Sequence, residues 1–315
     1  MTMLKMRWSG KPLLVLLGPT AVGKTSLAIE LAEALGGEII GADSRQVYRQ
    51  MDIGTAKPTP SQCQQIPHHL INLINPDQNL SLAEYQTQAY TAIEAILERN
   101  HLPMLVGGTG QYITAVTEGW SIPAVPPNEA LREELESFAR EHGAVALYQR
   151  LEDVDPSAAK GIDYRNVRRV IRALEVHMTT GIPISVLQQK RPTHYRTYQL
   201  GLTLDRDALY AQADQRVDQM ILDGFVDEVE ALLEKGYDPQ LPSMSGLGYR
   251  QIAAHLNKVI SLADAITDTK HATHDFIRRQ FTWFRGHDNG ILWHNRRDID
   301  TGRLIKSIAQ WLQQD

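Results

Sequence analysis

The chain has 315 residues and a mass of 35.4 kDa. At roughly 100–200 residues per domain, this length fits two domains or one large core with an insertion. Hydrophobic residues make up 43% of the chain and charged residues 22%, a balance that excludes a disordered or collagen-like chain. The one cysteine, Cys63, excludes a disulfide framework and zinc sites with paired cysteines, so we expect a cytoplasmic protein. The net charge of −5 excludes a uniformly basic coat for nucleic acid, but not a local basic face.

Strand and helix signals alternate in the first third of the chain. Continuous apolar runs predict buried strands at 13–17, 38–42 and 103–106, and helical spacing of apolar residues predicts helices at 24–35 and 83–99. This alternation is typical of an α/β fold with a parallel sheet and right-handed crossovers. No apolar run approaches the ~20 residues of a membrane span, so we expect no membrane partner.

The pattern changes after a proline-rich connector at 122–127. Three helices are predicted next, at 128–142, 145–152 and 163–180, and no strand is predicted until 198–204. We therefore expect a helical insertion at 118–195 between two parts of one core, 1–117 and 196–315. The last third predicts helices at 209–235, 248–257, 262–267 and 271–286, and a strand at 291–294.

Residues 18–25 match the phosphate-binding pattern G-x-x-x-x-G-K-[ST] and lie between a predicted strand and a predicted helix. Glycines let backbone N–H groups surround phosphate oxygens, and the helix N-terminus adds partial positive charge. Lys24 adds a full charge, and the Thr25 hydroxyl is a ligand for Mg²⁺. The motif predicts a P-loop NTPase-like core that binds a polyphosphate through Gly18, Pro19, Thr20, Ala21, Val22, Gly23, Lys24 and Thr25.

Two polar residues follow predicted strands, where parallel sheets place ligands. Asp43 follows the strand at 38–42, and Thr109 follows the strand at 103–106. From its position alone, Asp43 is a candidate to hold Mg²⁺ through water, to accept a proton or to cap a helix. Thr109 is a candidate site residue or a turn residue in a glycine-rich loop.

A basic stretch lies inside the predicted insertion. Arg165, Arg168, Arg169 and Arg172 have the spacing i, i+3, i+4 and i+7, which places them on one stripe of the helix predicted at 163–180. Eight basic and two acidic residues between 160 and 196 give this stretch a net charge of +6. A solvated face would explain the stripe, but an anionic partner explains it better, because arginines without acidic neighbours repel one another. The eight basic residues are Lys160, Arg165, Arg168, Arg169, Arg172, Lys190, Arg191 and Arg196.

A second basic cluster lies close to the C-terminus. Arg278, Arg279 and Arg285 are interleaved with aromatic residues at 281, 283 and 284. This pattern fits a helix that is part core and part surface, or a surface that stacks bases and binds phosphate. Residues 246–251 fit a close approach of backbone to a ligand, or a plain helix start.

Several motifs together resemble the tRNA dimethylallyltransferase family, and they follow one another along nearly the whole chain. The most specific are residues 43–49 (DSRQVYR) and 51–58 (MDIGTAKP). The others are the pattern at 18–25, PHHLI at 67–71, GGTG at 107–110, RVIRALEV at 169–176, GYR at 248–250 and RQFTWFR at 279–285.

The resemblance implies transfer of a dimethylallyl group from dimethylallyl diphosphate to N6 of adenine 37 in tRNA. The P-loop would hold the diphosphate with Mg²⁺ at Thr25, Asp43 would accept the N6 proton, and Thr109 would lie near the bridging oxygen and the incoming nucleotide. The insertion would grip the anticodon stem-loop, and we expect a monomer. The tRNA-binding residues that the resemblance implies are Asp43, Ser44, Arg45, Gln46, Thr109, Arg165, Arg168, Arg169, Arg172, Gly248, Tyr249 and Arg250.

The sequence departs from the family pattern at a few positions. Asn72 replaces a frequent Asp, His274 replaces a frequent Arg, Gln111 replaces a frequent Leu, and Arg168 replaces a Gln of some members. Two other functions compete with tRNA modification: prenyl transfer to free adenylate, and phosphoryl transfer by a small-molecule P-loop kinase. The arginine-rich insertion argues against the first, and residues 43–49 argue against the second.

Overall fold

The computed structural model describes residues 10–123, 125–188, 193–288 and 290–314. Contacts divide the chain into two units, residues 1–117 with 193–315, and residues 118–192. The limit predicted at 195 lies too far along the chain, because Tyr195 begins strand β5 of the first unit. No helix of the described ranges is both long and apolar enough to cross a membrane.

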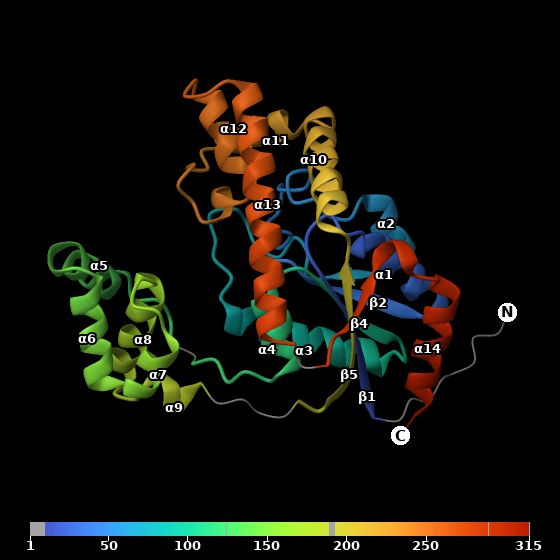
Figure 1. Cartoon of the computed structure of the whole chain (residues 1–315), viewed down its shortest axis with the longest axis horizontal. Coiled ribbons are helices and arrows are strands. Elements are labelled where there is room, and N and C mark those ends of the chain that lie inside the picture. Colours follow the sequence, from blue (N-terminus) through green and yellow to red (C-terminus); the bar gives the residue numbers. More distant parts are fainter. Residues whose placement is uncertain (1–9, 124, 189–192, 289, 315) are drawn as a thin grey trace. The chain divides into compact units, whose positions relative to one another are not determined.

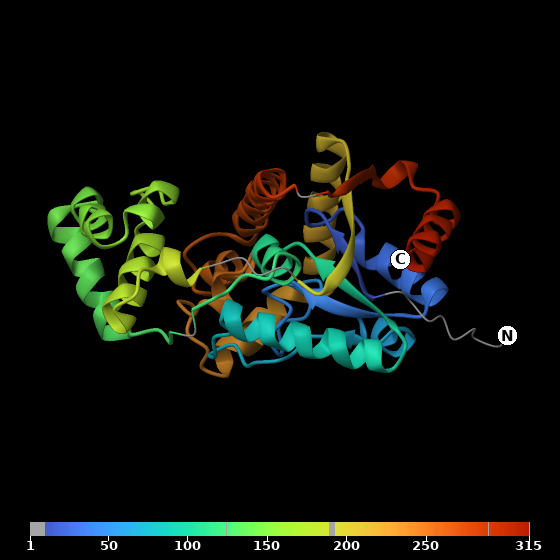
Figure 2. The same ribbon diagram turned by 90° about the horizontal axis from the view of Figure 1, so that it is seen from below.

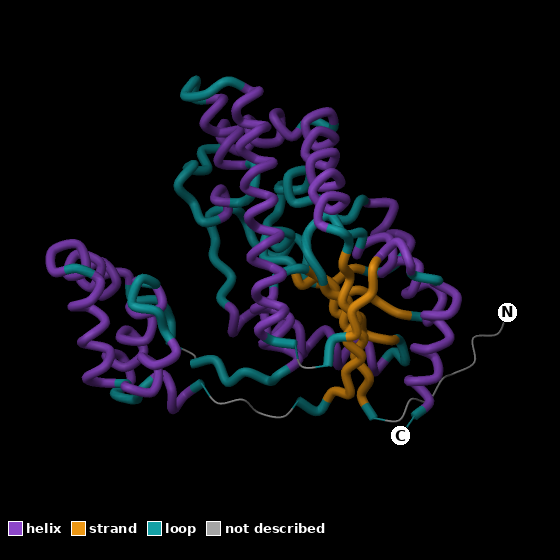
Figure 3. The backbone as a smooth tube through the Cα atoms, in the orientation of Figure 1, coloured by secondary structure: helices purple, strands orange, loops and turns teal. Residues whose placement is uncertain are grey.

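Six parallel strands form one sheet in the described part of the first unit, in the order β3-β2-β4-β1-β5-β6. Figure 3 shows the strands in orange, and Figure 1 labels β1, β2, β4 and β5. The strands that the apolar runs predict are all present. The bounds are β1 (Lys11–Leu17), β2 (Gly37–Ala42), β3 (His68–His69), β4 (Leu102–Gly107), β5 (Tyr195–Thr203) and β6 (Leu292–Asn295).

Helices cover both faces of this sheet, which explains why its central strands are apolar without a break. Alternate residues of β1 enter two different cores, because successive side chains of a strand point to opposite faces. One core receives α1 (Lys24–Leu35) and α14 (Thr301–Gln313), seen on one side of the strands in Figure 1. The other receives α3 (Leu82–Glu98), which runs along the sheet in Figure 2, and α4 (Gly110–Thr117).

One further short helix of the first unit lies between β2 and β3, and the others follow β5. That helix is α2 (Pro60–Gln65). After β5 come α10 (Arg206–Leu222), α11 (Phe225–Glu234), the 3₁₀ turn η1 (Ser243–Ser245), α12 (Tyr249–Leu256), α13 (Leu262–Gly286) and the 3₁₀ turn η2 (Arg296–Asp298).

The second unit is helical and has a core of its own. Its buried apolar residues, among them Leu135, Leu151 and Val170, pack together in one cluster. The helices are α5 (Glu129–His142), α6 (Ala144–Val154), α7 (Pro156–Gly161), α8 (Val167–Thr180) and α9 (Ile184–Leu187).

Three helix predictions were wrong in their limits. The helix predicted at 209–235 is two helices, because Gly224 has a φ of 96° and ends the first. The two helices predicted at 262–267 and 271–286 are one, in which the hydroxyl of buried Thr269 donates to the carbonyl of Ala265. The helix predicted from 163 begins at Val167, because the side chain of Asn166 caps it. Elements α2, α4, α7, α9, α14 and β3 were not predicted.

Candidate active site

Three loops meet at one edge of the sheet. The last residues of β1, β4 and β2 are in register, with Leu17 and Ala42 both opposite Gly107. Since the strands are parallel, the loops that follow them lie side by side. A side chain at Gly107 has no room, because its Cβ would lie 2.0 Å from the carbonyl oxygen of Ala42. The P-loop, the segment from Asp43 and the segment from Thr109 are thus close neighbours.

The P-loop has the backbone that anion binding needs. Gly23 lies in the left-handed region with a φ of 90°, and Ala21 shares this conformation with a φ of 64°. A Cβ at Gly18 would lie 2.6 Å from the carbonyl oxygen of Leu202 on β5. The loop therefore needs glycine at both ends of the motif, one for its φ and one for its close contact with the sheet.

Lys24 folds back on the P-loop. Its Nζ donates to the carbonyl oxygens of Gly18, at 2.9 Å, and Pro19, at 2.6 Å. Burial lowers the pKa of Lys24 to about 7, the charge of Asp43 opposes this shift, and the charge of Arg216 adds to it. A pKa close to neutral pH makes the charge of Lys24 sensitive to the charged groups around it.

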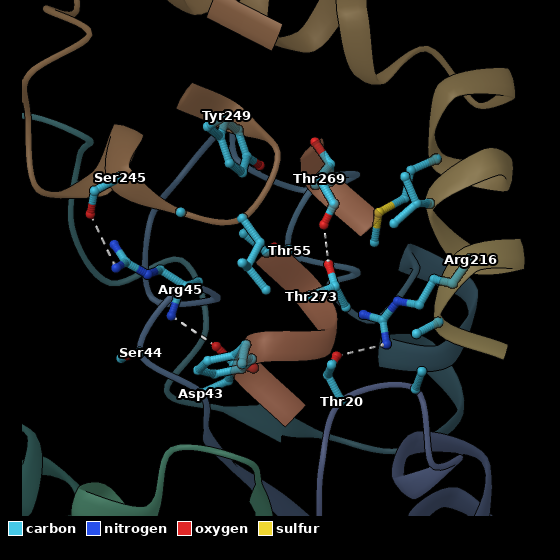
Figure 4. A pocket seen from close by; sticks show the side chains of 18 of the residues that line it. Thr20, Asp43, Ser44, Arg45, Thr55, Arg216, Ser245, Tyr249, Thr269 and Thr273 are labelled. Carbon is cyan, nitrogen blue, oxygen red and sulfur yellow. Dashed lines mark hydrogen bonds between the residues drawn. The ribbon is translucent and has the colours of Figure 1, made fainter. Parts of the chain in front are cut away.

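Two cavities open on this group of loops. The α10–α13 cavity, of about 250 Å³, is lined by residues of α10 and α13 and by the segments after Asp43 and before α12 (Figure 4). The P-loop cavity, of about 430 Å³, is lined by Lys24, Thr25 and the loop around them. Both cavities are lined by Thr20, Ala21, Asp43 and Arg216. These four residues form the junction between the cavities.

Asp43 and Thr109 come together as their positions after neighbouring strands predict. Oδ1 of Asp43 accepts the N–H of Arg45 at 2.9 Å, while no group in the described ranges donates to Oδ2. Oγ1 of Thr109 accepts the N–H of Ser44 at 2.9 Å and donates to Oγ of Ser44 at 3.3 Å. The Asp43 carboxylate thus keeps one oxygen available at the junction, with its orientation set by the backbone of Arg45.

Sequence reasoning missed Arg216 at this junction. It lies on α10, and its guanidinium donates to Oγ1 of Thr20 at 3.5 Å (Figure 4). Desolvation lowers its pKa, and the charge of Asp43 opposes this shift. A single arginine in a helix has no motif around it, so only the packing of α10 reveals a cation aimed at the P-loop.

Several residues predicted to bind tRNA make contacts within the protein. The guanidinium of Arg45 donates to the carbonyl oxygen of Pro242 at 2.6 Å and to Oγ of Ser245 at 3.2 Å, which holds the segment before α12 (Figure 4). The amide of Gln46 donates to the carbonyl oxygens of Thr55 and Ala56, each at 3.1 Å. These residues shape the walls of the cavities.

The segment Gly248, Tyr249, Arg250 begins helix α12. Tyr249 is buried, and its hydroxyl donates to Glu228 at 2.7 Å, so the ring lines the α10–α13 cavity while its polar end is engaged. Gly248 has a φ of 84°, and its Cβ would lie 2.4 Å from the ring of Phe225. Glycine is therefore required at position 248 by packing as well as by φ. Arg250, the last residue of the segment, is exposed.

Glu228 on α11 is a second residue that sequence reasoning missed. Its carboxylate accepts the N–H groups of three successive residues, Asp52 at 2.8 Å, Ile53 at 2.7 Å and Gly54 at 3.2 Å, and the hydroxyl of Tyr249. It thereby anchors the specific block at 51–58, whose Gly54 and Thr55 line the α10–α13 cavity.

The four arginines of the predicted stripe belong to the second unit, and they do not form one stripe. Arg165 precedes the helix and pairs with Asp163, and Arg172 pairs with buried Glu175. Arg168 and Arg169 are exposed on the first turns of α8, and no acidic side chain in the described ranges pairs with them. Of the four arginines, these two are left as candidates to bind an anion.

The other basic residues of this stretch lie elsewhere. Lys160 is exposed on α7 of the second unit. Arg196 belongs to β5 in the first unit, where it stacks on the ring of Trp311. Lys190 and Arg191 lie outside the described residues.

The second basic cluster is a helix that is part core and part surface. On α13, Phe284 and Gln280 are buried, while Arg278, Arg279 and Arg285 are exposed. Arg278 pairs with Asp275, and Arg279 lines the α10–α13 cavity.

Two departures from the family pattern have partners. Oδ1 of Asn72 accepts a hydrogen bond of 2.7 Å from Lys57, so the amide supplies the oxygen that an aspartate would. His274 contacts Asp214 at 2.8 Å and stacks on Tyr210. The histidine that replaces a frequent arginine thus has a carboxylate as its partner.

The residues present fit Mg²⁺ if a substrate supplies most of the ligands. The described ranges contain no group of three or more His, Cys, Asp or Glu residues that could hold a metal ion. The Thr25 hydroxyl and the Asp43 carboxylate both line the P-loop cavity. A small number of protein oxygen ligands suits Mg²⁺, because this ion is usually bound by one or two protein groups together with phosphates and waters.

Comparison with known proteins gives one family. A family model described as IPP transferase matches residues 46–287. A tRNA dimethylallyltransferase of Roseiflexus sp. (strain RS-1) is 54% identical, over 87% of this chain and 90% of its own. The same enzyme of Dehalococcoides mccartyi is 50% identical, over 96% and 93%.

Solved structures agree with these relatives. A tRNA isopentenylpyrophosphate transferase of Bacillus halodurans is 39% identical, with a TM-score of 0.70 over 96% of this chain and 95% of its own. A eukaryotic dimethylallyltransferase, described as acting on tRNA, is 26% identical, with a TM-score of 0.78 over 96% and 77%. From its sequence motifs, its P-loop sheet and these relatives, the chain belongs to the tRNA dimethylallyltransferase family.

Proposed function

We propose that this protein transfers a dimethylallyl group from dimethylallyl diphosphate to N6 of adenine 37 in tRNAs and releases pyrophosphate. The observation that supports this reaction best is the position of Asp43, which lines both cavities at their junction. A diphosphate in the P-loop cavity and an adenine in the α10–α13 cavity would meet at this carboxylate. Residues 43–49 and the relatives, which are named as tRNA dimethylallyl- or isopentenyltransferases, favour this reaction over phosphoryl transfer by a kinase.

The diphosphate would leave from the P-loop. Its negative charge grows as the bond between the allylic carbon and the bridging oxygen breaks, so fixed donors favour that state over the ground state. The N–H groups of the P-loop, Lys24 and Arg216 are the donors at hand. The approach of a diphosphate would restore the full charge of Lys24, since an anion favours the protonated amine.

Mg²⁺, when bound, would neutralise charge on the phosphate oxygens, and the Thr25 hydroxyl is the protein group that would hold it.

The acceptor nitrogen needs a base because its lone pair is conjugated with the adenine ring. As N6 forms its bond to the allylic carbon, that carbon loses its bond to the diphosphate oxygen, and the N6 proton passes to Asp43. The available Oδ2 is suited to this transfer, because Oδ1 is engaged by Arg45. Thr109, which lies beside Ser44, would face the bridging oxygen and the nucleotide.

The acceptor would be the anticodon stem-loop of a tRNA. An adenine in a loop must leave its stack to enter a closed cavity, and this requires a grip on the surrounding backbone. Arg168 and Arg169 of the second unit are exposed cations with no acidic partner among the described residues, and they are suited to bind phosphates. The relatives are named for tRNA as acceptor, which favours tRNA over a free adenylate. We expect the enzyme to act as a monomer in the cytoplasm.

The test mixes the protein with Mg²⁺, labelled dimethylallyl diphosphate and unmodified tRNA. We expect label in the tRNA, at adenine 37 after nuclease digestion. A tRNA with guanine at position 37 is the matched control and should remain unlabelled. Label in AMP in place of tRNA would overturn the acceptor, and phosphorylation of a small molecule from ATP would overturn the reaction class.

A further inference from the structure

Gln280 of α13 has a place in the site that the reaction described above does not use. The residue lies within the motif at 279–285, is buried, and lines the P-loop cavity. Its Oε1 accepts the N–H of Thr20 at 2.9 Å, and its Nε2 donates to the carbonyl oxygen of Gly108 at 2.9 Å. One amide thus joins the P-loop to the loop after β4.

Each end of this amide has a backbone partner that requires its particular atom. An N–H faces its oxygen and a carbonyl faces its nitrogen, so neither a carboxylate nor a thioether can satisfy the two loops together. The loop after β4 is also shaped to receive it, because a Cβ at Gly108 would lie 2.4 Å from Nε2 of Gln280. The pairing of glycine and glutamine explains why one residue of the GGTG segment has no side chain.

The bridge continues to the proposed base. Gly108 precedes Thr109, whose hydroxyl accepts the N–H of Ser44 next to Asp43. The contacts therefore run from the P-loop through Gln280 and Thr109 to the segment of Asp43. The P-loop would hold the leaving group and Asp43 would take the proton, so this path connects the two groups that act on opposite sides of the reacting carbon.

We infer that Gln280 is a positioning residue that sets the separation between the diphosphate-binding loop and the loop of Thr109. This inference rests on the proposed function. Both polar ends of Gln280 are engaged by backbone groups, and the side chain adds no charge. Its effect is on alignment, since a carbon in transfer must lie in line between N6 and the bridging oxygen, and a misplacement of about 1 Å can cost about 10²-fold in rate.

The first experiment compares Gln280→Met, which keeps length and removes both hydrogen bonds, with Thr282→Ala. Thr282 is exposed on the same helix, and its hydroxyl bonds only the carbonyl oxygen of Arg278 in the described ranges. We expect Gln280→Met to lower kcat by about 10- to 100-fold while tRNA affinity changes by less than about 2-fold. Thr282→Ala should match the wild type. The wild-type assay run beside them tests the proposed function separately, because prenyl transfer by the wild type is independent of how Gln280→Met behaves.

The second experiment perturbs the same contact from the other loop. Gly108→Ala should displace Nε2 of Gln280 and lower kcat in the same way. The double variant should cost little more than the slower single variant, because both changes break one contact. Additive losses, an unchanged kcat in Gln280→Met, or a loss that follows only the unfolded fraction in thermal melts would overturn the inference.

Discussion

Arg172 donates a hydrogen bond of 2.6 Å to the carboxylate of Glu175, which is fully buried in the second unit. The same carboxylate accepts two bonds from Arg132 and one from the N–H of Asn128. Arg172 also donates to the carbonyl oxygen of Val125. An arginine that looks in sequence like part of a nucleic-acid-binding stripe is therefore a half-buried residue that neutralises a buried charge.

Arg172→Ala is expected to destabilise the second unit. Loss of one partner leaves the Glu175 carboxylate buried and undercompensated, which typically costs roughly 3–5 kcal/mol. Arg132 remains and moderates the loss, so the lower end of this range is expected. Chemical denaturation of the full chain measures this loss of stability, and limited proteolysis shows whether cleavage occurs within residues 118–192. A stability equal to that of wild type would contradict a structural role for Arg172.

Arg168→Ala with Arg169→Ala should weaken tRNA binding without affecting stability, because both side chains are exposed. Each lost phosphate contact should reduce the slope of log affinity against log salt by about 1. Filter binding at several salt concentrations measures the slope. A control variant at exposed Arg165, already paired with Asp163, should have a smaller effect. An unchanged slope in the double variant would make Arg168 and Arg169 a solvated face.

Asp43→Asn should lower kcat by about 10²- to 10⁴-fold, since an amide cannot accept the N6 proton. The amide oxygen can still accept the N–H of Arg45, so the turn after β2 is preserved. We expect the affinity for tRNA to stay within about 3-fold of the wild-type value, because asparagine has the same shape as aspartate. Near-normal turnover would show that another group takes the proton.

Lys24 predicts a pH dependence in donor capture. Because the folded protein has its Lys24 pKa lowered to about 7, the free enzyme loses this charge as the pH rises through that value. For the wild type, kcat/KM for the donor should fall above pH 7. Arginine stays charged across this pH range, so kcat/KM of the Lys24→Arg variant should not fall above pH 7, whatever its absolute value. The same alkaline limb in both proteins would assign the titration to another group.

Glu38 predicts acid sensitivity at a place remote from the reaction. Its buried carboxylate bonds Arg99, His69 and His101. Desolvation by burial, which alone would raise the pKa, is outweighed by these hydrogen bonds, and the pKa falls from 4.5 to about 2. A pKa lowered by folding adds stability at pH above 4.5, and that stability is lost as the pH falls toward 2.

Glu38→Gln should lower stability at pH 7 by roughly 1.5–3 kcal/mol, because partly exposed Arg99 and the two histidines lose a charged hydrogen-bond acceptor. The variant should also flatten the decline of stability between pH 4.5 and 2. Urea denaturation across this range measures both. An acid limb of unchanged steepness would assign it to other carboxylates.

Much of the first unit follows from local pattern. Helix α1 begins and ends where its apolar spacing and the glycines around it predict. The strands before Gly18, Asp43 and Thr109 are continuous apolar runs, and parallel strands bring their carboxyl ends together. The proposed base and the P-loop could therefore be placed near each other from sequence alone, and the family could be named from the blocks at 43–49 and 51–58.

What depends on contacts distant in sequence could not be read in this way. Arg216 lies 173 positions after Asp43 yet shares its junction, and Gln280 lies 260 positions after Thr20 yet bonds its N–H. Side-chain spacing shows which face of a helix is polar, but not what that face meets. Arg172 and Arg168 look alike in the sequence, and only the buried carboxylate of Glu175 separates a structural arginine from one free to bind a phosphate.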